Sequence, residues 1–313
     1  MRAARWLWRE DDDCWLPLGG LVLLGGREGI GKSTWGYRLA AQVTRGTLPG
    51  AMFGRLRGVA ICATEDSWDH TVLPRLAAAG ADLDRVHELT AVEGAVTSGV
   101  TLPVDVAEVS AICREHDIGL LLLDPLLGTI SGRLDTHKDA EVRQALEPLS
   151  RLAHESEATV IGLIHENKGQ GADLLTRLMG SRAFAAVARA VLVCAEEKSE
   201  LQEGDFGDSL DLGKPARRTF LFGQEKNNLG RRVEQSIRYE IEGVTVGFDD
   251  EWSKGIKSMR IGVLGIADER VGARWVLRYR WELDTWHIKR AARGIVTRRI
   301  ADASIITEER CPS

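Results

Sequence analysis

The eight residues at positions 26–33 constrain the fold more than any other part of this sequence. They read GREGIGKS and fit the pattern G-x-x-x-x-G-K-[ST], which we call the P-loop. The apolar run at 21–24 precedes the P-loop and a helical pattern follows it. A strand, a glycine-rich loop and a helix in this order let backbone N–H groups and the helix N-terminus bind the α and β phosphates of a nucleotide. In another context the same residues would form a plain turn.

The P-loop pattern also assigns chemistry to individual side chains. Lys32 is expected to reach the β and γ phosphates, and the Ser33 hydroxyl to hold Mg²⁺. The residues expected to contact ATP are Gly26, Arg27, Glu28, Gly29, Ile30, Gly31, Lys32, Ser33 and Thr34.

Apolar runs alternate with helical patterns along most of the chain, which predicts an α/β fold with a mostly parallel sheet covered by helices. Strands are expected near 21–25, 58–64, 86, 119–124, 158–164 and 190–195, and helices near 32–45, 105–115 and 181–188 and over the helical spacings at 72–77 and 142–152. Segments 218–224 and 234–248 look like strands without helices between them. They predict an antiparallel C-terminal edge of the sheet.

The strand pattern stops near residue 250, which suggests an ATPase domain at 1–250 and a separate tail at 251–313. The tail contains 13 Lys/Arg against 8 Asp/Glu and four of the nine Trp. Because the whole chain has a net charge of −5, residues 1–250 carry a net charge of −10. The tail is therefore a candidate nucleic-acid surface, although a solvated basic face explains the excess equally well.

Cysteine usage and hydropathy indicate where the chain works. The five cysteines are scattered without a C-x-x-C pair, and no signal peptide precedes them, which favours a reducing cytoplasm. No apolar run approaches the ~18 to 20 residues that span a bilayer, so no membrane association is expected.

Acidic residues follow two of the expected strands. Asp124 closes the apolar run at 119–123 and is the expected Mg²⁺ carboxylate. Pro125 comes next, at the position where many AAA+ ATPases carry the catalytic glutamate, so another carboxylate must activate water. Glu65, after the strand at 58–64, is the best candidate base, with Asp66 as the alternative. Alternatively, the acidic pair complements the dipole of a following helix.

Two further segments extend the expected site. His165 follows the strand at 158–164, where a polar side chain can detect the γ phosphate. The strand at 218–224 is followed by residues 226–232, which we call the basic turn because they include Lys226, Arg231 and Arg232. One of these three cations could act as a finger on the transition-state phosphate, either in its own chain or in a neighbouring subunit, although a solvated turn is an equally good reading.

With these elements in place, residues 5–248 resemble the RecA-like ATPases of the RepA-type hexameric replicative helicase family. The resemblance rests on Trp15-Leu16-Pro17-Leu18-Gly19, the P-loop, Glu65-Asp66-Ser67, Pro74-Arg75-Leu76, Gly80-Ala81-Asp82, Asp124-Pro125-Leu126, residues 135–143, His165-Glu166-Asn167-Lys168, Arg177, Gly180-Ser181-Arg182-Ala183-Phe184 and Lys226-Asn227-Asn228-Leu229-Gly230. Asn228 stands where related ring helicases often carry arginine. The tail after residue 250 matches no recognised pattern.

The resemblance implies a RecA-like core that uses ATP and Mg²⁺, assembles as a homo-oligomeric ring, expected to be a hexamer, and couples hydrolysis to single-stranded DNA. It implies catalytic roles for Lys32, Glu65, Asp124 and His165. Loops 127–137 and 166–180 would face the ring channel, with Lys168 and Arg177 as candidate DNA contacts. A primase or replication initiator is a candidate partner, since the chain shows no primase domain of its own.

A site of this kind could serve three functions. The first is an ATPase motor on single-stranded DNA, in which Glu65 orients water onto the γ phosphate. The second is an ATP-dependent DNA-binding or regulatory switch without unwinding activity. A P-loop kinase is disfavoured, because the expected site supplies a base for water and no arginine-bearing lid.

Overall fold

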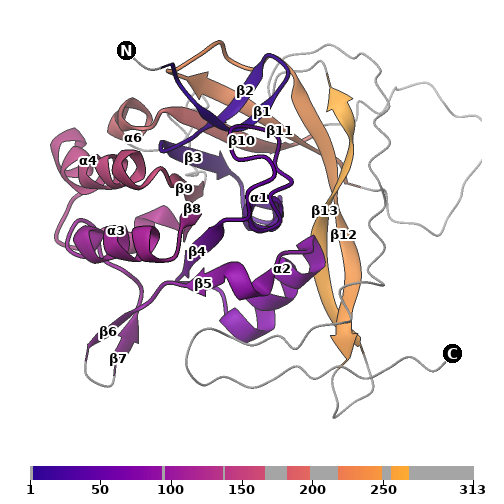
Figure 1. The fold of residues 1–313 in the computed structure, drawn as a ribbon, viewed down its shortest axis with the longest axis horizontal. Coiled ribbons are helices and arrows are strands. Elements are labelled where there is room, and N and C mark those ends of the chain that lie inside the picture. Colours follow the sequence, from indigo (N-terminus) through magenta and orange to yellow (C-terminus); the bar gives the residue numbers. More distant parts are fainter. Residues whose placement is uncertain are drawn as a thin grey trace, which may run out of the picture.

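The computed structural model describes residues 3–93, 96–136, 138–165, 182–197, 218–248 and 255–267. Within these ranges nine strands form one sheet in the order β13-β12-β11-β10-β3-β9-β8-β4-β5 (Figure 1). Their bounds are β3 (Leu21–Gly26), β4 (Gly58–Ala63), β5 (Val86–Glu88), β8 (Ile118–Asp124), β9 (Thr159–His165), β10 (Ala190–Glu196), β11 (Phe220–Asn227), β12 (Ser236–Phe248) and β13 (Gly255–Ala267).

The sheet combines a parallel block with an antiparallel edge. From β10 to β5 all neighbouring strands are parallel, whereas β10–β11, β11–β12 and β12–β13 are antiparallel pairs. Both features of the predicted fold class are confirmed. The continuous apolar runs explain the parallel block, because β3 and most of β8 are buried on both faces, as strands between two layers of helices must be.

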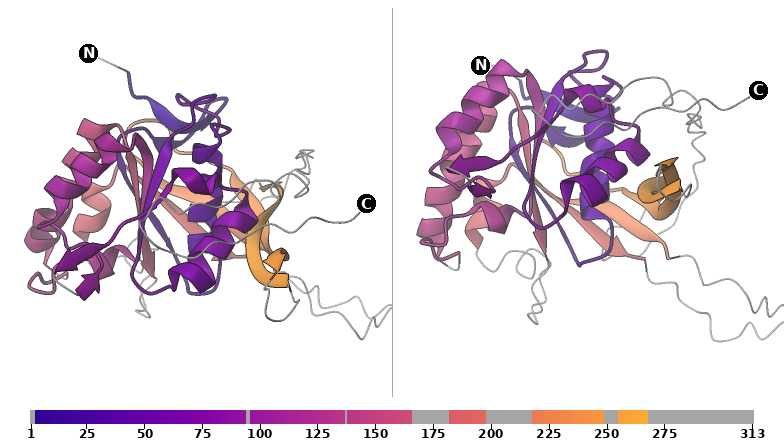
Figure 2. Two further views of the ribbon diagram at one scale, coloured as in Figure 1. Left: turned by 60° about the horizontal axis from the view of Figure 1, so that its bottom comes forward. Right: turned by 90° about the horizontal axis from the view of Figure 1, so that it is seen from below.

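Helices cover both faces of the sheet (Figure 2). On one face, α1 (Lys32–Thr44) and α2 (Leu73–Ala79) pack on side chains such as Leu24 and Leu122. On the other, α3 (Val106–Glu115), α4 (Asp139–Ser156) and α6 (Arg182–Val187) pack on side chains such as Leu23 and Leu121. Alternate residues of β3 and β8 thus point into different halves of the core.

Short elements complete the connections. Residues Trp68–Val72 form one turn of π-helix before α2, and Leu83–Arg85 and Leu126–Thr129 form 3₁₀ turns. Strands β6 (Ala91–Glu93) and β7 (Val96–Ser98) pair with each other outside the main sheet. Pro148 lies inside α4, within the helical pattern expected there.

An N-terminal hairpin, which the sequence analysis did not predict, closes one end of the core. Strands β1 (Trp6–Glu10) and β2 (Asp13–Pro17) pair antiparallel. The hairpin contributes Trp8 and Trp15 to an aromatic stack with Trp35 of α1 and Phe222 of β11, in which the Trp35 and Phe222 ring centroids are 4.1 Å apart. The stack fastens the first helix after the P-loop to the sheet.

A C-terminal hairpin extends the other end of the sheet. β12 and β13 pair along almost their whole length, and the hairpin packs against α1 and α2 (Figure 1). The sheet therefore continues beyond residue 250, and the expected boundary lies in the connection between two paired strands. The rest of the tail, residues 268–313, lies outside the described part of the chain.

Candidate active site

The parallel strands bring the predicted site residues to one edge of the sheet. Gly26, which ends β3, is opposite His165, which ends β9. Ala63, two residues before Glu65, is opposite Asp124, which ends β8. Because all four strands end at the same edge, the P-loop, the histidine and both carboxylates gather there, as ligand-binding residues do in open α/β sheets.

The P-loop has a backbone conformation that requires glycine. Gly31 has φ +87° and is the N-cap of α1, a conformation that costs an L-residue about 1–2 kcal/mol. Arg27, Glu28 and Gly29 are exposed, whereas Ile30 and Thr34 are buried. The exposed residues form the accessible tip of the loop, and the buried ones anchor it to the core.

Lys32 lies beneath this loop. Its side chain is only 5% exposed, and Nζ donates to the Arg27 carbonyl at 2.6 Å. The Lys32 ammonium is thus held inside the curve of the P-loop, where the pattern places phosphate oxygens.

A close helix–strand approach brings Ser33 to Asp124. Although β9 separates β3 from β8 in the sheet, α1 crosses over β8 at Gly36, where an added Cβ would lie 3.2 Å from Leu122 Cδ1. The Ser33 hydroxyl consequently reaches the Asp124 carboxylate and hydrogen-bonds to it. Ser33 and Asp124, the two residues expected to hold Mg²⁺, therefore lie together although β3 and β8 are not adjacent strands.

The surroundings of Asp124 oppose its charge. Burial raises the pKa of its carboxyl above the usual value, and the nearby Asp66 carboxylate raises it further. The Ser33 hydrogen bond, His165 and Lys32 act in the opposite direction. A cation bound at this carboxylate would relieve the cost of its desolvation.

His165 stands between the phosphate-binding lysine and the candidate base. Its Nδ1 is 3.3 Å from Lys32 Nζ, and its Nε2 is 3.9 Å from Glu65 Oε2. Because a lysine ammonium can only donate, Nδ1 must be the acceptor, which leaves the ring proton on Nε2, facing Glu65. The histidine thus connects the two residues for which the sequence predicts phosphate binding and water activation.

The segment after β4 holds Glu65 at the site. Asp66 pairs with Arg75 of α2 at 3.3 Å, and the Ser67 hydroxyl accepts from the His70 backbone N–H, which caps the following helical turn. Glu65 precedes this cap, and its side chain is 67% exposed. The two acidic residues therefore differ in their surroundings: Asp66 is held by the Arg75 guanidinium, whereas Glu65 faces the open side of the site.

The donor atoms present fit Mg²⁺ bound with a nucleotide. Among the residues described, no three His, Cys, Asp or Glu side chains gather into a metal cage. The Ser33 hydroxyl and Asp124 carboxylate are instead a small oxygen-donor set next to a phosphate-binding loop. Mg²⁺ favours this arrangement, because it is usually bound by one or two protein oxygens together with substrate phosphates and water.

The basic turn lies at the opposite edge of the sheet. Asn227 at the end of β11 is opposite Ala190, the first residue of β10, and Ala190 pairs with Val22 near the start of β3. The P-loop follows the other end of β3. No residue of the basic turn can therefore reach the phosphate site of its own chain, and a role there requires a second copy.

The three finger candidates differ in their contacts. Lys226 Nζ donates to the Ala185 and Ala188 carbonyls, where it caps the C-terminal end of α6, and burial lowers its pKa. Arg232 pairs with Glu225 at 3.3 Å. Arg231 is exposed. Of the three, Arg231 has the most freedom to extend toward another molecule.

Asn227 and Leu229 shape the surface around Arg231. The Asn227 carbonyl oxygen Oδ1 accepts from the Leu229 and Gly230 N–H groups, and its Nδ2 donates to the Arg231 carbonyl. Leu229 is 43% exposed at the tip of the turn. The turn is thus rigidly built and presents an apolar side chain next to a cation.

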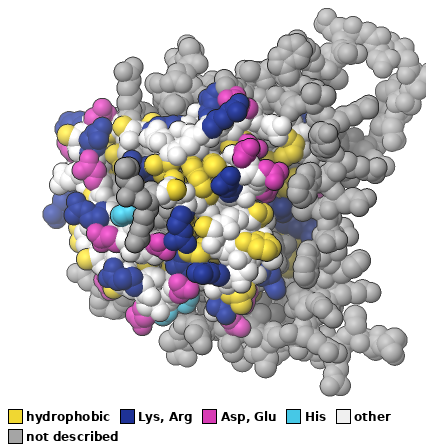
Figure 3. Space-filling model, turned by 45° about the horizontal axis from the view of Figure 1, so that its top comes forward, with side chains coloured by type: hydrophobic (Ala, Val, Ile, Leu, Met, Phe, Trp, Pro, Cys, Tyr) yellow, Lys and Arg dark blue, Asp and Glu magenta, His cyan; other side chains and the backbone are white. Residues whose placement is uncertain are grey.

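The candidate DNA contacts are placed only in part. Lys168 and Arg177, with the rest of loop 166–180, lie outside the described residues. The other candidate loop begins with the 3₁₀ turn Leu126–Thr129 at the edge that carries the P-loop. On the face shown in Figure 3, basic and acidic side chains are interspersed with hydrophobic ones.

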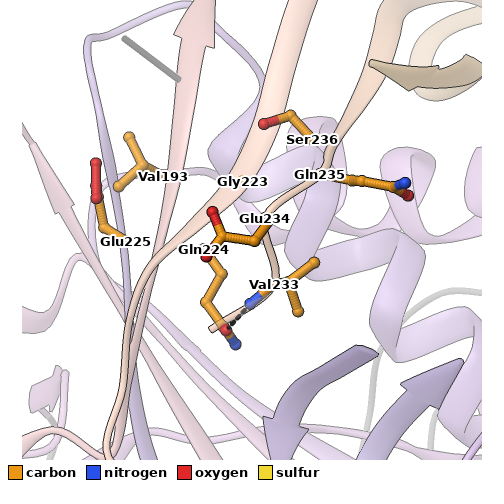
Figure 4. A pocket seen from close by; sticks show the side chains of 8 residues that line it. All are labelled: Val193, Gly223, Gln224, Glu225, Val233, Glu234, Gln235 and Ser236. Atoms are coloured by element: carbon orange, nitrogen blue, oxygen red, sulfur yellow. Dashed lines mark hydrogen bonds between the residues drawn. The ribbon is translucent and has the colours of Figure 1, made fainter. Parts of the chain in front are cut away.

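A small cavity lies apart from the P-loop, between β10, β11 and residues 233–236 (Figure 4). Across it, Gln224 Oε1 accepts from the Val233 N–H at 2.9 Å. Its volume of about 10 Å³ holds a single water at most, whereas ligand pockets are tens of times larger. This cavity is not a substrate site.

Two residues near the site carry no motif of their own. Arg75 fixes Asp66, and the Tyr239 hydroxyl of β12 contacts the P-loop backbone. Neither residue could be assigned to the site from its position in the sequence, because only the tertiary fold brings it there. Arg75 was noted in the sequence as part of Pro74-Arg75-Leu76, without a role.

Comparison with known proteins gives one family. A family model described as an AAA domain matches residues 1–171, more than half of the chain. No curated protein matches the sequence. None of the helices in the described ranges combines the length and apolar character needed to cross a bilayer.

Proposed function

Because the chain belongs to the AAA-domain family of P-loop ATPases, we propose that it is a RecA-like motor of the RepA type, which hydrolyses ATP on single-stranded DNA. The observation that supports hydrolysis best is the series Lys32–His165–Glu65, which links a phosphate-binding cation to a carboxylate on the open side of the site.

In this proposal each side chain has one task. Lys32 binds the β and γ phosphates in place of the Arg27 carbonyl and the His165 ring, its present neighbours. Glu65 accepts a proton from the water that attacks the γ phosphorus, while the bond to the β-phosphate oxygen breaks and ADP leaves. Mg²⁺, held by Ser33 and Asp124, would neutralise charge on the phosphates.

His165 can report the state of the phosphate to the rest of the chain. Once Lys32 turns to the phosphates, His165 Nδ1 loses its donor, so the ring is free to change its contacts with Glu65 and with the segment that follows it. Loop 166–180 directly follows His165, and we propose Lys168 and Arg177 in this loop as contacts to DNA phosphates. Release of the γ phosphate would then alter DNA binding.

The position of the basic turn supports head-to-tail assembly of the subunits. A site at one edge of the subunit and a cation at the opposite edge form a heterologous contact, in which each copy completes the site of the next. We propose Arg231 as the trans-acting cation and Leu229 as an apolar contact beside it. A closed ring, such as a hexamer, also provides a channel for single-stranded DNA.

Unwinding of a forked DNA duplex, measured together with particle mass in the presence of ATP, tests this proposal. The motor predicts a ring whose unwinding requires hydrolysable ATP and is absent in Lys32→Ala. A protein that binds DNA with slow, unstimulated turnover and separates no strands would instead be the regulatory switch. A primase or replication initiator would then be sought as the partner of the ring.

A further inference from the structure

Three residues of the C-terminal hairpin contact the back of the P-loop. Tyr239 of β12 donates from its hydroxyl to the Ile30 carbonyl at 2.5 Å, and its side chain is fully buried. At Gly31, an added Cβ would lie 3.2 Å from Ile241 Cδ1 and 3.4 Å from Ile261 Cδ1. The hairpin, residues 236–267, lies wholly beyond the region that the family model matches.

The hydrogen bond from Tyr239 fixes the direction of one P-loop peptide. The Ile30–Gly31 bond is trans, so its C=O and N–H point in opposite directions. Because the carbonyl is directed at Tyr239, the Gly31 N–H must point away from the hairpin. A loop that binds phosphate through N–H groups needs this orientation, and rotation of the peptide would present an oxygen in place of the donor.

The donor and its surroundings are suited to holding the loop in place. Burial raises the pKa of Tyr239 above its usual value, so its hydroxyl keeps its proton and remains a donor at neutral pH. The Cys194 thiol also lies at the hydroxyl, and the Trp35 ring lies edge-on to the tyrosine with centroids 5.5 Å apart. The tyrosine is therefore held by packing and has a fixed target.

We infer that the C-terminal hairpin is a brace for the P-loop, with Tyr239 as a positioning residue for the phosphate-binding backbone and Ile241 and Ile261 as its apolar support. This inference rests on the proposed function in so far as the loop binds ATP. It assigns a role in nucleotide binding to a segment beyond the matched family region.

The test removes the hydroxyl alone. Tyr239→Phe keeps the ring and its packing, so the fold should persist. Thr159→Val is the matched control, because its buried hydroxyl donates to the Pro17 carbonyl at 2.8 Å at the other edge of the sheet. Both variants lose one buried hydroxyl–carbonyl bond and should show comparable decreases in Tm.

Hydrogen exchange of nucleotide-free protein is the first measurement. We expect amides of the P-loop peptide to exchange about three to ten times faster in Tyr239→Phe, the change that loss of one hydrogen bond produces. In Thr159→Val these amides should exchange as in the wild type. Unchanged exchange in Tyr239→Phe, or equal acceleration in both variants, would overturn the brace.

Affinity for a fluorescent ADP with Mg²⁺ is the second measurement. An incorrectly oriented loop lowers the fraction of binding-competent protein, so Kd should rise about three- to tenfold in Tyr239→Phe and stay within twofold in Thr159→Val. Ile241→Val, which deletes the methyl nearest Gly31, should weaken binding less. Normal affinity in Tyr239→Phe would overturn its positioning role.

The two failures are distinguishable. The hydrogen-exchange measurement needs no nucleotide, so it tests the brace independently of the proposed ATPase activity. Absence of DNA-stimulated turnover in the wild type would contradict the proposed motor, whatever the exchange rates of the variants.

Discussion

Replacement of Glu65 by Gln separates catalysis from folding. Glu65 is 67% exposed and its neighbour His165 is 3.9 Å away, so loss of the charge should cost well below ~1 kcal/mol of stability. Loss of a general base, in contrast, lowers the rate about 10²- to 10⁴-fold, equivalent to about 2.7–5.5 kcal/mol in the activation barrier. The two effects differ severalfold, so a change in kcat would report chemistry.

Phosphate release at saturating ATP measures this effect, with nucleotide affinity and Tm recorded on the same samples. Glu65→Gln should bind ATP as the wild type does, melt within a few degrees of it and hydrolyse ATP at least about a hundred times more slowly. Asp66→Asn is the matched control, because its carboxylate is adjacent but paired with Arg75. Wild-type turnover in Glu65→Gln would show that Glu65 is not the base, and a comparable loss in Asp66→Asn alone would assign the base to Asp66.

Three further predictions follow from single contacts. Asp124→Asn should raise the Tm of the nucleotide-free protein at neutral pH, because burial raises the pKa of the Asp124 carboxyl in the folded state. A raised folded-state pKa stabilises the protein below the unfolded pKa, and this stabilisation is lost as pH rises through the folded pKa. The variant should also lose stabilisation by Mg²⁺ with ATP, and a lower Tm of the nucleotide-free variant would contradict the prediction. Trp35→Ala, at a 1% exposed position stacked on Phe222, should cost about 3–5 kcal/mol in urea unfolding, whereas a loss below ~1 kcal/mol would refute the packing argument. Arg231→Ala should lose turnover and regain part of it when mixed with Glu65→Gln subunits, since a mixed contact of one order pairs an intact base with an intact arginine; no recovery would contradict a site shared between copies.

The parts of the fold predicted from sequence are those that local patterns determine. The runs at 21–24 and 119–123 are uniformly apolar because their strands are buried on both faces, and the P-loop pattern fixes a strand, a turn and a helix together. The N-terminal hairpin was not predicted, although Trp6 and Trp8 on one side and Trp15 on the other flank an acidic turn. Five-residue strands carry too little periodic signal to stand out from a loop.

Local sequence patterns contain no information about strand order or about contacts between residues far apart in the sequence. The sequence places Asp124 at a strand end, but its hydrogen bond to Ser33 depends on α1 crossing β8 at Gly36, which no spacing reveals. From the sequence, the basic turn could supply a cation to a phosphate site or be no more than a solvated turn. The antiparallel register of β11 on β10 excludes only the chain's own site, because it moves the turn to the far edge of the sheet.

The proposal that this chain is a DNA-dependent ATPase motor can be checked by its rate of ATP hydrolysis as single-stranded DNA is added. We expect the rate to rise with DNA concentration and to saturate, and Lys32→Ala to show no turnover at any concentration. An equal rate with and without single-stranded DNA, in a wild-type protein that binds both ligands, would contradict it.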